Sequence, residues 1–407
     1  MYENSRYQIV ILDPQGSGLR ETLGGALTRK AAELGLDPQR ALRFLGPGDI
    51  AEDYSTPDLI VGVYRGGPLQ DEACTKALEN LRKMRADILP LVDDLDTYPE
   101  SVPAVLRPIN GMKVDASDAE MNTPVSRILE MLRLLRSQRR LFISYKRAES
   151  RRAAVQLYYL LQECRFDVFL DTHGVQTGDR VQDELGQRLL DADVMIFLDT
   201  TGAKKSEWIR HEIGIANALN IGVLQIIFPR PGGTLDRDLF TALCEPMELT
   251  EADFSGRDFA RQDGEPLEPA TLTQIALRVE GLRARSMAAR RNRLTAQLLA
   301  ALDDPMLSHR PSYKVCPGRF ISVQKSGGKV RVFPQIGVVA SQALHGAETE
   351  AEKDYQAAAD TGSAQVAVLY DPTGLRDESQ RHLDWLCRYA KIAPISLLNI
   401  EQWVRAG

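Results

Sequence analysis

Trp208 and Glu212, spaced four residues apart, form the pair with the clearest chemical potential in this sequence. They lie in SEWIRHEI, which predicts a helix that begins after Ser206, a residue type that commonly caps helix N-termini. Side chains at i and i+4 share one helix face, so the indole would give the carboxylate an apolar, water-poor neighbour. A fixed carboxylate can stabilise the positive charge that develops when a glycosidic bond breaks. The alternative is a core tryptophan beside a solvated surface acid.

Four apolar segments around this pair predict the strands of a parallel sheet. They span residues 141–144, 167–170, 194–198 and 222–228, and they alternate with amphipathic segments that predict crossover helices. In such sheets the ligand crevice lies at the carboxyl ends of the strands. Three of the predicted strands end in polar residues, namely Tyr145-Lys146-Arg147, Asp171-Thr172-His173 and Asp199-Thr200-Thr201. This polar edge is therefore the expected functional edge of the sheet.

Three blocks of this segment, FISYKR, FDVFLDTHGVQTGD and SEWIRHEI, resemble in order and spacing the Toll/interleukin-1 receptor (TIR) domain. The resemblance is closest to the bacterial and axon-degeneration branch, whose members hydrolyse NAD+, and it covers the central part of the chain. It implies a flavodoxin-like α/β domain that cleaves the bond between nicotinamide and ribose. NAD+ is then the substrate, and no cofactor or metal is expected.

The resemblance also implies roles for individual residues. Glu212 matches the catalytic glutamate, and one carboxylate suffices because nicotinamide leaves as a neutral ring without a general acid. Residues 171–178 match the BB loop, which gates the site and mediates self-association between TIR domains. The implied residues are the catalytic Glu212; the substrate-binding Tyr145, Lys146, Arg147, Asp171, Asp199, Thr200 and Trp208; and His173, Gly174 and Gly178 of the BB loop.

The chain differs from many active members of that branch at two places. Asp199-Thr200 stands where they carry a serine after the third strand. Arg180-Val181 stands where they often carry an aromatic residue after the BB-loop glycine. Either difference would tune the substrate or weaken the enzyme.

Length and composition set broad limits on the class of protein. The chain has 407 residues, with 43% hydrophobic and 26% charged residues, which predicts two to three globular domains. A net charge of -6 creates no overall field that favours nucleic acid or an anionic membrane. The 5 scattered cysteines, with no signal peptide and no apolar run of about 20 residues, indicate a cytoplasmic protein.

The central domain is expected at residues 138–290, between two further Rossmann-like α/β units. Residues 1–137 predict a TIR-like or receiver-like unit, in which Asp13 to Gly18 forms either a phosphate loop or, by preference, a plain turn. A helical linker is expected at residues 291–309, and a small α/β domain at 310–407. Polar residues after its strands, including Gln335 and Asp371, could line a nucleotide-sized pocket. The flanking units are thus candidates for binding a protein or nucleotide trigger.

Residues 272–302 predict one long helix that carries clustered arginines, among them Arg283, Arg285, Arg290 and Arg293. A basic helix can bind nucleic acid or an acidic partner. Charge runs more often face water, so a solvated connector helix is the preferred interpretation.

Three functions fit these patterns. The first is an assembled TIR effector that destroys NAD+ or cyclises its ADP-ribose, with a role in phage defence or signalling. The second is a non-catalytic interaction protein or scaffold. The third makes the terminal units nucleotide sensors that control a signalling synthase. The residues around Glu212 favour the first.

Overall fold

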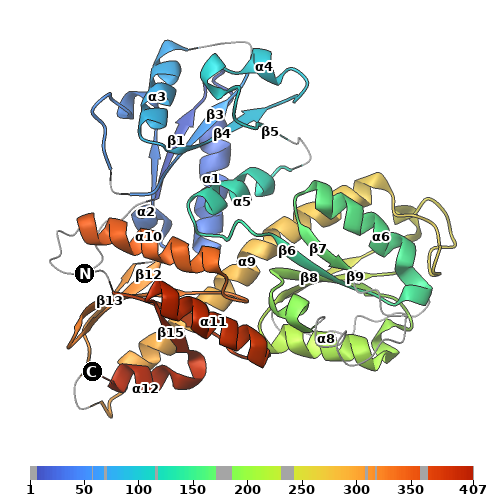
Figure 1. Cartoon of the computed structure of the whole chain (residues 1–407). Coiled ribbons are helices and arrows are strands. Elements are labelled where there is room, and N and C mark those ends of the chain that lie inside the picture. Colours follow the sequence, from blue (N-terminus) through green and yellow to red (C-terminus); the bar gives the residue numbers. More distant parts are fainter. Residues whose placement is uncertain are drawn as a thin grey trace. The chain divides into compact units, whose positions relative to one another are not determined.

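The computed structural model describes residues 7–56, 58–67, 71–114, 118–170, 186–230, 243–307, 310–316, 319–357 and 365–406 (Figure 1). Contacts divide the chain into two compact units. One contains Met1–Ser137, Lys314–Phe320 and Glu352–Gly362; the other contains Gln138–Tyr313, Ile321–Ala351 and Ser363–Gly407. The α/β class predicted from the sequence is confirmed, because the described strands form mainly parallel sheets with helices between the strands.

The N-terminal sheet is wholly parallel, in the order β2-β1-β3-β4-β5. This is the flavodoxin-like 2-1-3-4-5 order. On the side that α3 covers, the apolar core is built from residues of this segment. The elements are β1 (Tyr7–Leu12), α1 (Leu19–Glu33), α2 (Pro38–Ala41), β2 (Leu42–Leu45), β3 (Ile60–Arg65), α3 (Glu72–Lys83), β4 (Asp87–Val92), α4 (Tyr98–Ser101), β5 (Met112–Lys113) and α5 (Asn122–Met131).

The turn after β1 satisfies its own polar groups. The carboxylate of Asp13 accepts hydrogen bonds from the Ser17 hydroxyl at 3.1 Å and from the Leu19 amide at 3.2 Å. Gly16 and Gly18 have φ values of 60° and 76°, a region that glycine enters without strain. An acidic side chain at the start of α1 also repels anions, so the plain turn fits this segment better than the phosphate loop.

The central sheet has the order β10-β9-β8-β6-β7. Read from the β7 edge, with its strands numbered from β6 in chain order, this is again 2-1-3-4-5. All its pairings are parallel. The winding reverses between β6 and β8, and this switch point is where such sheets bind ligands. The elements are β6 (Arg140–Ser144), α6 (Arg147–Glu163), β7 (Asp167–Leu170), β8 (Val194–Asp199), α8 (Glu207–Ala218), β9 (Gly222–Ile227), β10 (Cys244–Glu248) and α9 (Pro269–Leu302). The four predicted strands are thereby confirmed.

Alternation along β6 gives the sheet two apolar faces, because successive strand residues point to opposite sides. Leu141 and Ile143 join the core that α6 and α9 cover. Phe142 joins the opposite core, which includes Ile209 and Ile213 of α8. Ser144, next in the alternation after Phe142, therefore faces the side of α8.

The C-terminal domain combines a hairpin with a parallel arrangement. β12 pairs antiparallel with β13, and β13, β14 and β15 are parallel. The elements are β11 (Tyr313–Cys316), β12 (Phe320–Lys325), β13 (Gly328–Pro334), α10 (Ser341–Ala357), β14 (Gln365–Tyr370), α11 (Asp377–Ala390), β15 (Ala393–Ser396) and α12 (Ile400–Arg405).

Helix α9 is one helix of 34 residues, as predicted, and it belongs to two cores. Ile275, Val279 and Leu282 pack into the core of the central domain. Leu294, Leu298 and Leu302 pack into the core of the C-terminal domain. The helix therefore runs without a break through residue 290, where the sequence predicts a change from domain to linker (Figure 1).

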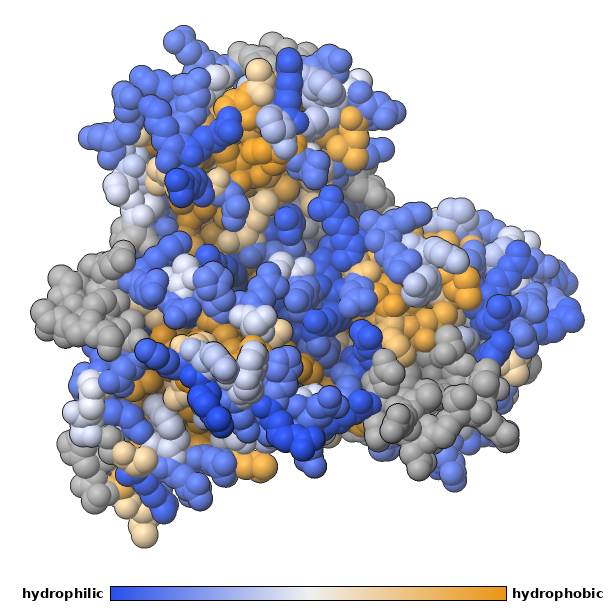
Figure 2. Space-filling model, in the orientation of Figure 1, coloured by the Kyte–Doolittle hydropathy of each residue, from blue (hydrophilic) through white to orange (hydrophobic). Residues whose placement is uncertain are grey.

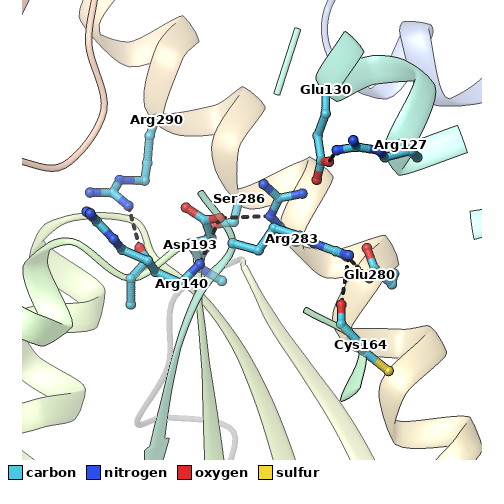
Figure 3. A network of polar contacts seen from close by, with 12 residues as sticks. Arg127, Glu130, Arg140, Cys164, Asp193, Glu280, Arg283, Ser286 and Arg290 are labelled. Carbon is cyan, nitrogen blue, oxygen red and sulfur yellow. Dashed lines mark hydrogen bonds and ion pairs between the residues drawn. The ribbon is translucent and has the colours of Figure 1, made fainter. Parts of the chain in front are cut away.

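The interpretation of the α9 arginines as solvated is wrong for two of them (Figure 3). Arg283 is fully buried, and its Nε donates to the equally buried carboxylate of Asp193 at 2.7 Å. Arg290 donates to the carbonyl oxygens of Leu190 and Ala192 at 3.0 and 2.8 Å. A buried guanidinium is tolerated when it is paired and hydrogen-bonded, so these arginines clamp α9 onto the sheet.

Hydrophilic side chains cover most of the face seen in Figure 2, with apolar side chains showing in the recesses between them. Among the described residues, no helix combines the length and the apolar character needed to cross a membrane.

Candidate active site

The carboxylate of Glu212 is buried, with 2% of the residue exposed. The Ser144 hydroxyl donates to Oε2 at 2.5 Å, and Trp208 Nε1 donates to Oε1 at 3.0 Å. Trp208 thus holds the carboxylate through its N–H group as well as flanking it with its ring. Hydrogen bonds to both oxygens fix the orientation of the group. A solvated surface acid does not fit this environment.

Two elements bring these side chains together at the switch point. Ser144 is the last residue of β6, and the neighbouring strand β8 leads through a short turn to α8. Ser206 caps α8 by accepting the Ile209 amide at 3.5 Å, as the sequence predicted. The cap sets where the helix begins and so places Trp208 and Glu212 in its first turns. Sequence reasoning missed Ser144, whose signal was a hydroxyl at the end of a predicted strand.

A second acid, Glu149 of α6, joins the loops that follow β6 and β8. It forms an ion pair with Lys146 at 2.6 Å and accepts the Gly202 amide at 2.8 Å. Burial acts to raise the pKa of Glu149, but the hydrogen bonds from Lys146 and Gly202, the nearby Thr200 hydroxyl and the ammonium charge of Lys146 outweigh it and lower that pKa. Lys146, one of the predicted nucleotide contacts, is thus paired with Glu149.

The hydroxyl of Thr200 is buried, and the residue is 1% exposed. It lies close enough to Glu149 to help lower the pKa of that carboxyl, although it has no hydrogen-bond partner of good geometry among the described residues. Tyr145 is also buried and packs into the core that includes Ile143. Arg147, the first residue of α6, is partly exposed.

Asp199, another predicted substrate contact, is fully buried and surrounded by donors. Gln225 donates to it at 2.7 Å, and Arg230 donates to both of its oxygens at 3.3 and 3.2 Å. Lys204 Nζ lies 3.2 Å from Oδ2. These contacts tie the end of β8 to β9 and to the chain on either side. The contacts of Asp199 with Gln225, Arg230 and Lys204 therefore give this residue a structural role.

Several predicted residues lie outside the described residues. They are Asp171, His173, Gly174 and Gly178, together with Arg180 and Val181. His211, one position before Glu212, is exposed on α8, and its ring lies 6.2 Å from that of Trp208. Within the described ranges, no group of three or more His, Cys, Asp or Glu side chains is placed to hold a metal ion.

Comparisons with known proteins bear on the central domain. The family model described as "TIR domain" matches residues 141–263. No curated protein matches the chain significantly.

Two solved structures share low similarity with most of the chain. A protein from Silicibacter pomeroyi DSS-3 named as a phosphosugar isomerase has 13% identity over 71% of this chain and 88% of its own, with a TM-score of 0.22. A protein from Salmonella typhimurium LT2 named as a sugar-binding protein has 11% identity over 70% of this chain and 88% of its own, also with a TM-score of 0.22. Neither likeness carries an argument at that score.

The family match covers β6 through β10, with the pair Ser144 and Glu212 inside it. It agrees with the 2-1-3-4-5 parallel sheet and with the site at its switch point. The protein is therefore a TIR-domain protein, with its TIR domain at residues 141–263.

Proposed function

We propose that the TIR domain is an NAD+ nucleosidase that uses Glu212 as its catalytic carboxylate. In this reaction the bond between the ribose carbon and the nicotinamide nitrogen breaks, and the bonding electrons leave with neutral nicotinamide. Water adds to the ribose carbon and loses a proton, which gives ADP-ribose; attack by a group within ADP-ribose would give a cyclic isomer instead. The TIR family includes NAD+-hydrolysing members, which is consistent with this proposal.

The observation that supports it most is the environment of Glu212. A buried carboxylate fixed by Ser144 and Trp208 at the switch point is pre-oriented toward a charge that develops there. Such a group acts in a water-poor site, where electrostatic stabilisation is stronger than in water. It requires no reorganisation when ribose gains oxocarbenium character.

Glu212→Gln tests the proposal, with Glu207→Gln as the matched control. The amide keeps the shape of the side chain and removes its charge, which we expect to slow nicotinamide release on the order of a hundredfold or more, or about 2.7–4 kcal/mol. Glu207 lies on the same helix with a side chain 95% exposed, so its replacement should leave the rate unchanged. Nicotinamide is measured by chromatography, and circular dichroism checks the fold of both variants.

Wild-type nicotinamide release from the folded Glu212→Gln variant would remove this residue from the mechanism. A wild-type protein that releases no nicotinamide at any concentration would favour the non-catalytic interaction protein. If the enzyme is active, depletion of cellular NAD+ is its expected output. We propose a defence or signalling role on that basis.

A further inference from the structure

A cavity of about 280 Å³ lies between the TIR domain and the C-terminal domain, both within the second compact unit. Its TIR side includes Arg140 and Asp167, the first residues of β6 and β7, and Arg188 of the helical residues 186–190. Ser144, by contrast, stands at the other end of β6. The cavity is therefore at the opposite edge of the sheet from the candidate active site.

The C-terminal side of the cavity includes Arg376. The Nε and Nη2 atoms of its guanidinium are buried, and within the described parts of the chain neither has a hydrogen-bond partner. Burying a charged donor without a partner costs several kcal/mol, so native proteins generally pair such groups or bind an ion there. Nε–H and Nη2–H lie on one edge of the planar guanidinium and donate in parallel, the geometry that matches two oxygens of a phosphate or carboxylate.

Further charged side chains line the cavity beside Arg376. Arg140 forms an ion pair with Asp191, whose Oδ1 also accepts the Val338 amide at 3.2 Å. Asp191 is thus already engaged. Arg188 adds a positive charge, with its guanidinium 5.8 Å from the centre of the Phe169 ring. Among the described residues that line the cavity, three are arginines, Arg140, Arg188 and Arg376, and two are acidic, Asp191 and the exposed Asp167.

Polar contacts already join the two domains beside the cavity. Gln187 donates to the Gly374 carbonyl at 2.5 Å, and the Ser379 hydroxyl donates to Gln187 at 3.5 Å. Ser379 also lies in the first turn of α11, a helix of 14 residues whose N-terminal amides favour a nearby anion. The two acids of that turn, Asp377 and Glu378, are exposed and are not part of the cavity wall.

We propose that this cavity binds a small phosphate monoester, with Arg376 donating two parallel hydrogen bonds to the phosphate. The volume is slightly below the usual range of small-molecule pockets, about 300–1,000 Å³, and suits a sugar phosphate or a mononucleotide. The ligand would bridge the TIR and C-terminal domains. The proposal goes beyond NAD+ cleavage and does not depend on it.

Calorimetric titration of the full chain tests this site with inorganic phosphate, ribose 5-phosphate and AMP, and with ribose and adenosine as unphosphorylated controls. We expect saturable binding of at least one monoester and none of the controls. Arg376→Gln should weaken that binding about tenfold or more, because it removes a charge-assisted pair of hydrogen bonds. Arg381→Gln, an exposed arginine on the same helix, is the matched control and should bind like the wild type.

Thermal unfolding gives a second readout. The monoester should raise the wild-type Tm but not that of Arg376→Gln, since a ligand stabilises only the state that binds it. If Arg376→Gln does not fold, the same binding and Tm measurements are made on Arg376→Lys. This variant keeps the positive charge but loses the two parallel N–H donors of the planar guanidinium. Absence of binding to both monoesters, or unchanged binding by Arg376→Gln or Arg376→Lys, would overturn the site. Inorganic phosphate bound as tightly as both monoesters would overturn the assignment to an ester.

Discussion

Three acidic side chains near the carboxyl edge of the central sheet differ in what surrounds them. The hydrogen bonds to Glu212 from Ser144 and Trp208 come from neutral donors. Asp199 is surrounded by the cations of Lys204 and Arg230. Neighbouring cations neutralise a carboxylate, whereas neutral donors orient it and leave its charge able to act on a ligand. The two hydrogen bonds to Glu212 are consistent with the catalytic role that we propose for it.

Glu149, the third of these acids, should link stability to pH. Its pKa in the folded protein lies below the ordinary glutamate value of 4.5, because hydrogen bonds to its charged form outweigh burial. A carboxylate whose pKa is lower in the folded than in the unfolded protein stabilises the fold at pH values above its unfolded pKa. This stabilisation is lost as the pH falls through its folded pKa.

We therefore expect Glu149→Gln to have a lower Tm than the wild type at pH 7. The difference should shrink as the pH falls below about 4.5, because the wild-type carboxylate then gains its proton. Thermal unfolding of both proteins from pH 7 to about pH 3.5 measures this. The exposed Glu207→Gln serves as control. A difference that stays constant or grows toward acid would contradict the lowered pKa.

At the scale of elements, α9 connects the two domains of the second unit. Its buried side chains alternate between apolar residues, which fill the two cores, and Arg283, Ser286 and Arg290, which bind polar groups of the TIR domain. The Ser286 hydroxyl donates to the Asp193 carbonyl at 2.7 Å and accepts the Gly222 amide at 2.9 Å. These bonds set the register of the helix against the sheet, since apolar contacts alone do not fix one position along it.

The buried pair Arg283 and Asp193 offers a test of this role. Arg283→Met should destabilise the TIR domain by about 3–5 kcal/mol, because it leaves the Asp193 carboxylate buried without its cation. The double change with Asp193→Leu should recover part of that loss, because it removes the unpaired charge as well. Chemical denaturation followed by circular dichroism gives both values. Equal stability of Arg283→Met and the wild type would show that the pair does not support the fold.

At the scale of the whole molecule, the apolar cores predict which segments fold together. The apolar cluster between α3 and the N-terminal sheet contains residues of the N-terminal segment, whereas α9 contributes to both the TIR and the C-terminal cores. We expect a chain of residues 138–407 to fold. A chain of residues 138–302 should expose Leu294, Leu298 and Leu302 at the end of α9. Each of these side chains then loses the stabilisation of about 1.5–3 kcal/mol that its burial provides.

Circular dichroism and size-exclusion chromatography of the two truncated chains measure this difference. The longer chain should unfold cooperatively, and the shorter one should lose helix at its end or aggregate. An unfolded 138–407 chain would show that the N-terminal segment completes its core.

Self-association provides the second prediction at this scale, and it rests on the proposed activity. TIR domains associate with one another in general, and the resemblance places the BB loop at residues 171–178. If a neighbouring copy holds the competent form, specific activity should rise with protein concentration. Gly178→Pro should lower activity, because proline fixes φ near about -65°. A specific activity that is constant from dilute protein upward would exclude activation by assembly.

The sequence alone determined the strands of the TIR domain and the face of α8 that carries Trp208 and Glu212. Both follow from local periodicity, because side chains alternate along a strand and recur at i+4 in a helix. The buried strands of residues 141–144 and 194–198 are continuous apolar runs, which makes them readable without knowledge of the fold. Helix α3 was missed although Asp71 caps it, and the hairpin of β12 and β13 was missed although Gly328 marks its turn.

Only the tertiary structure decided which polar groups meet. Ser144 lies 68 positions from Glu212 in the chain, and Arg283 lies 90 positions from Asp193. No local pattern encodes such pairings, because burial and proximity arise when whole elements pack. The sequence interpretation of Arg283 and Arg290 was wrong for this reason: an arginine faces water by default, and the cost of burying it is met by partners that come together only in the fold.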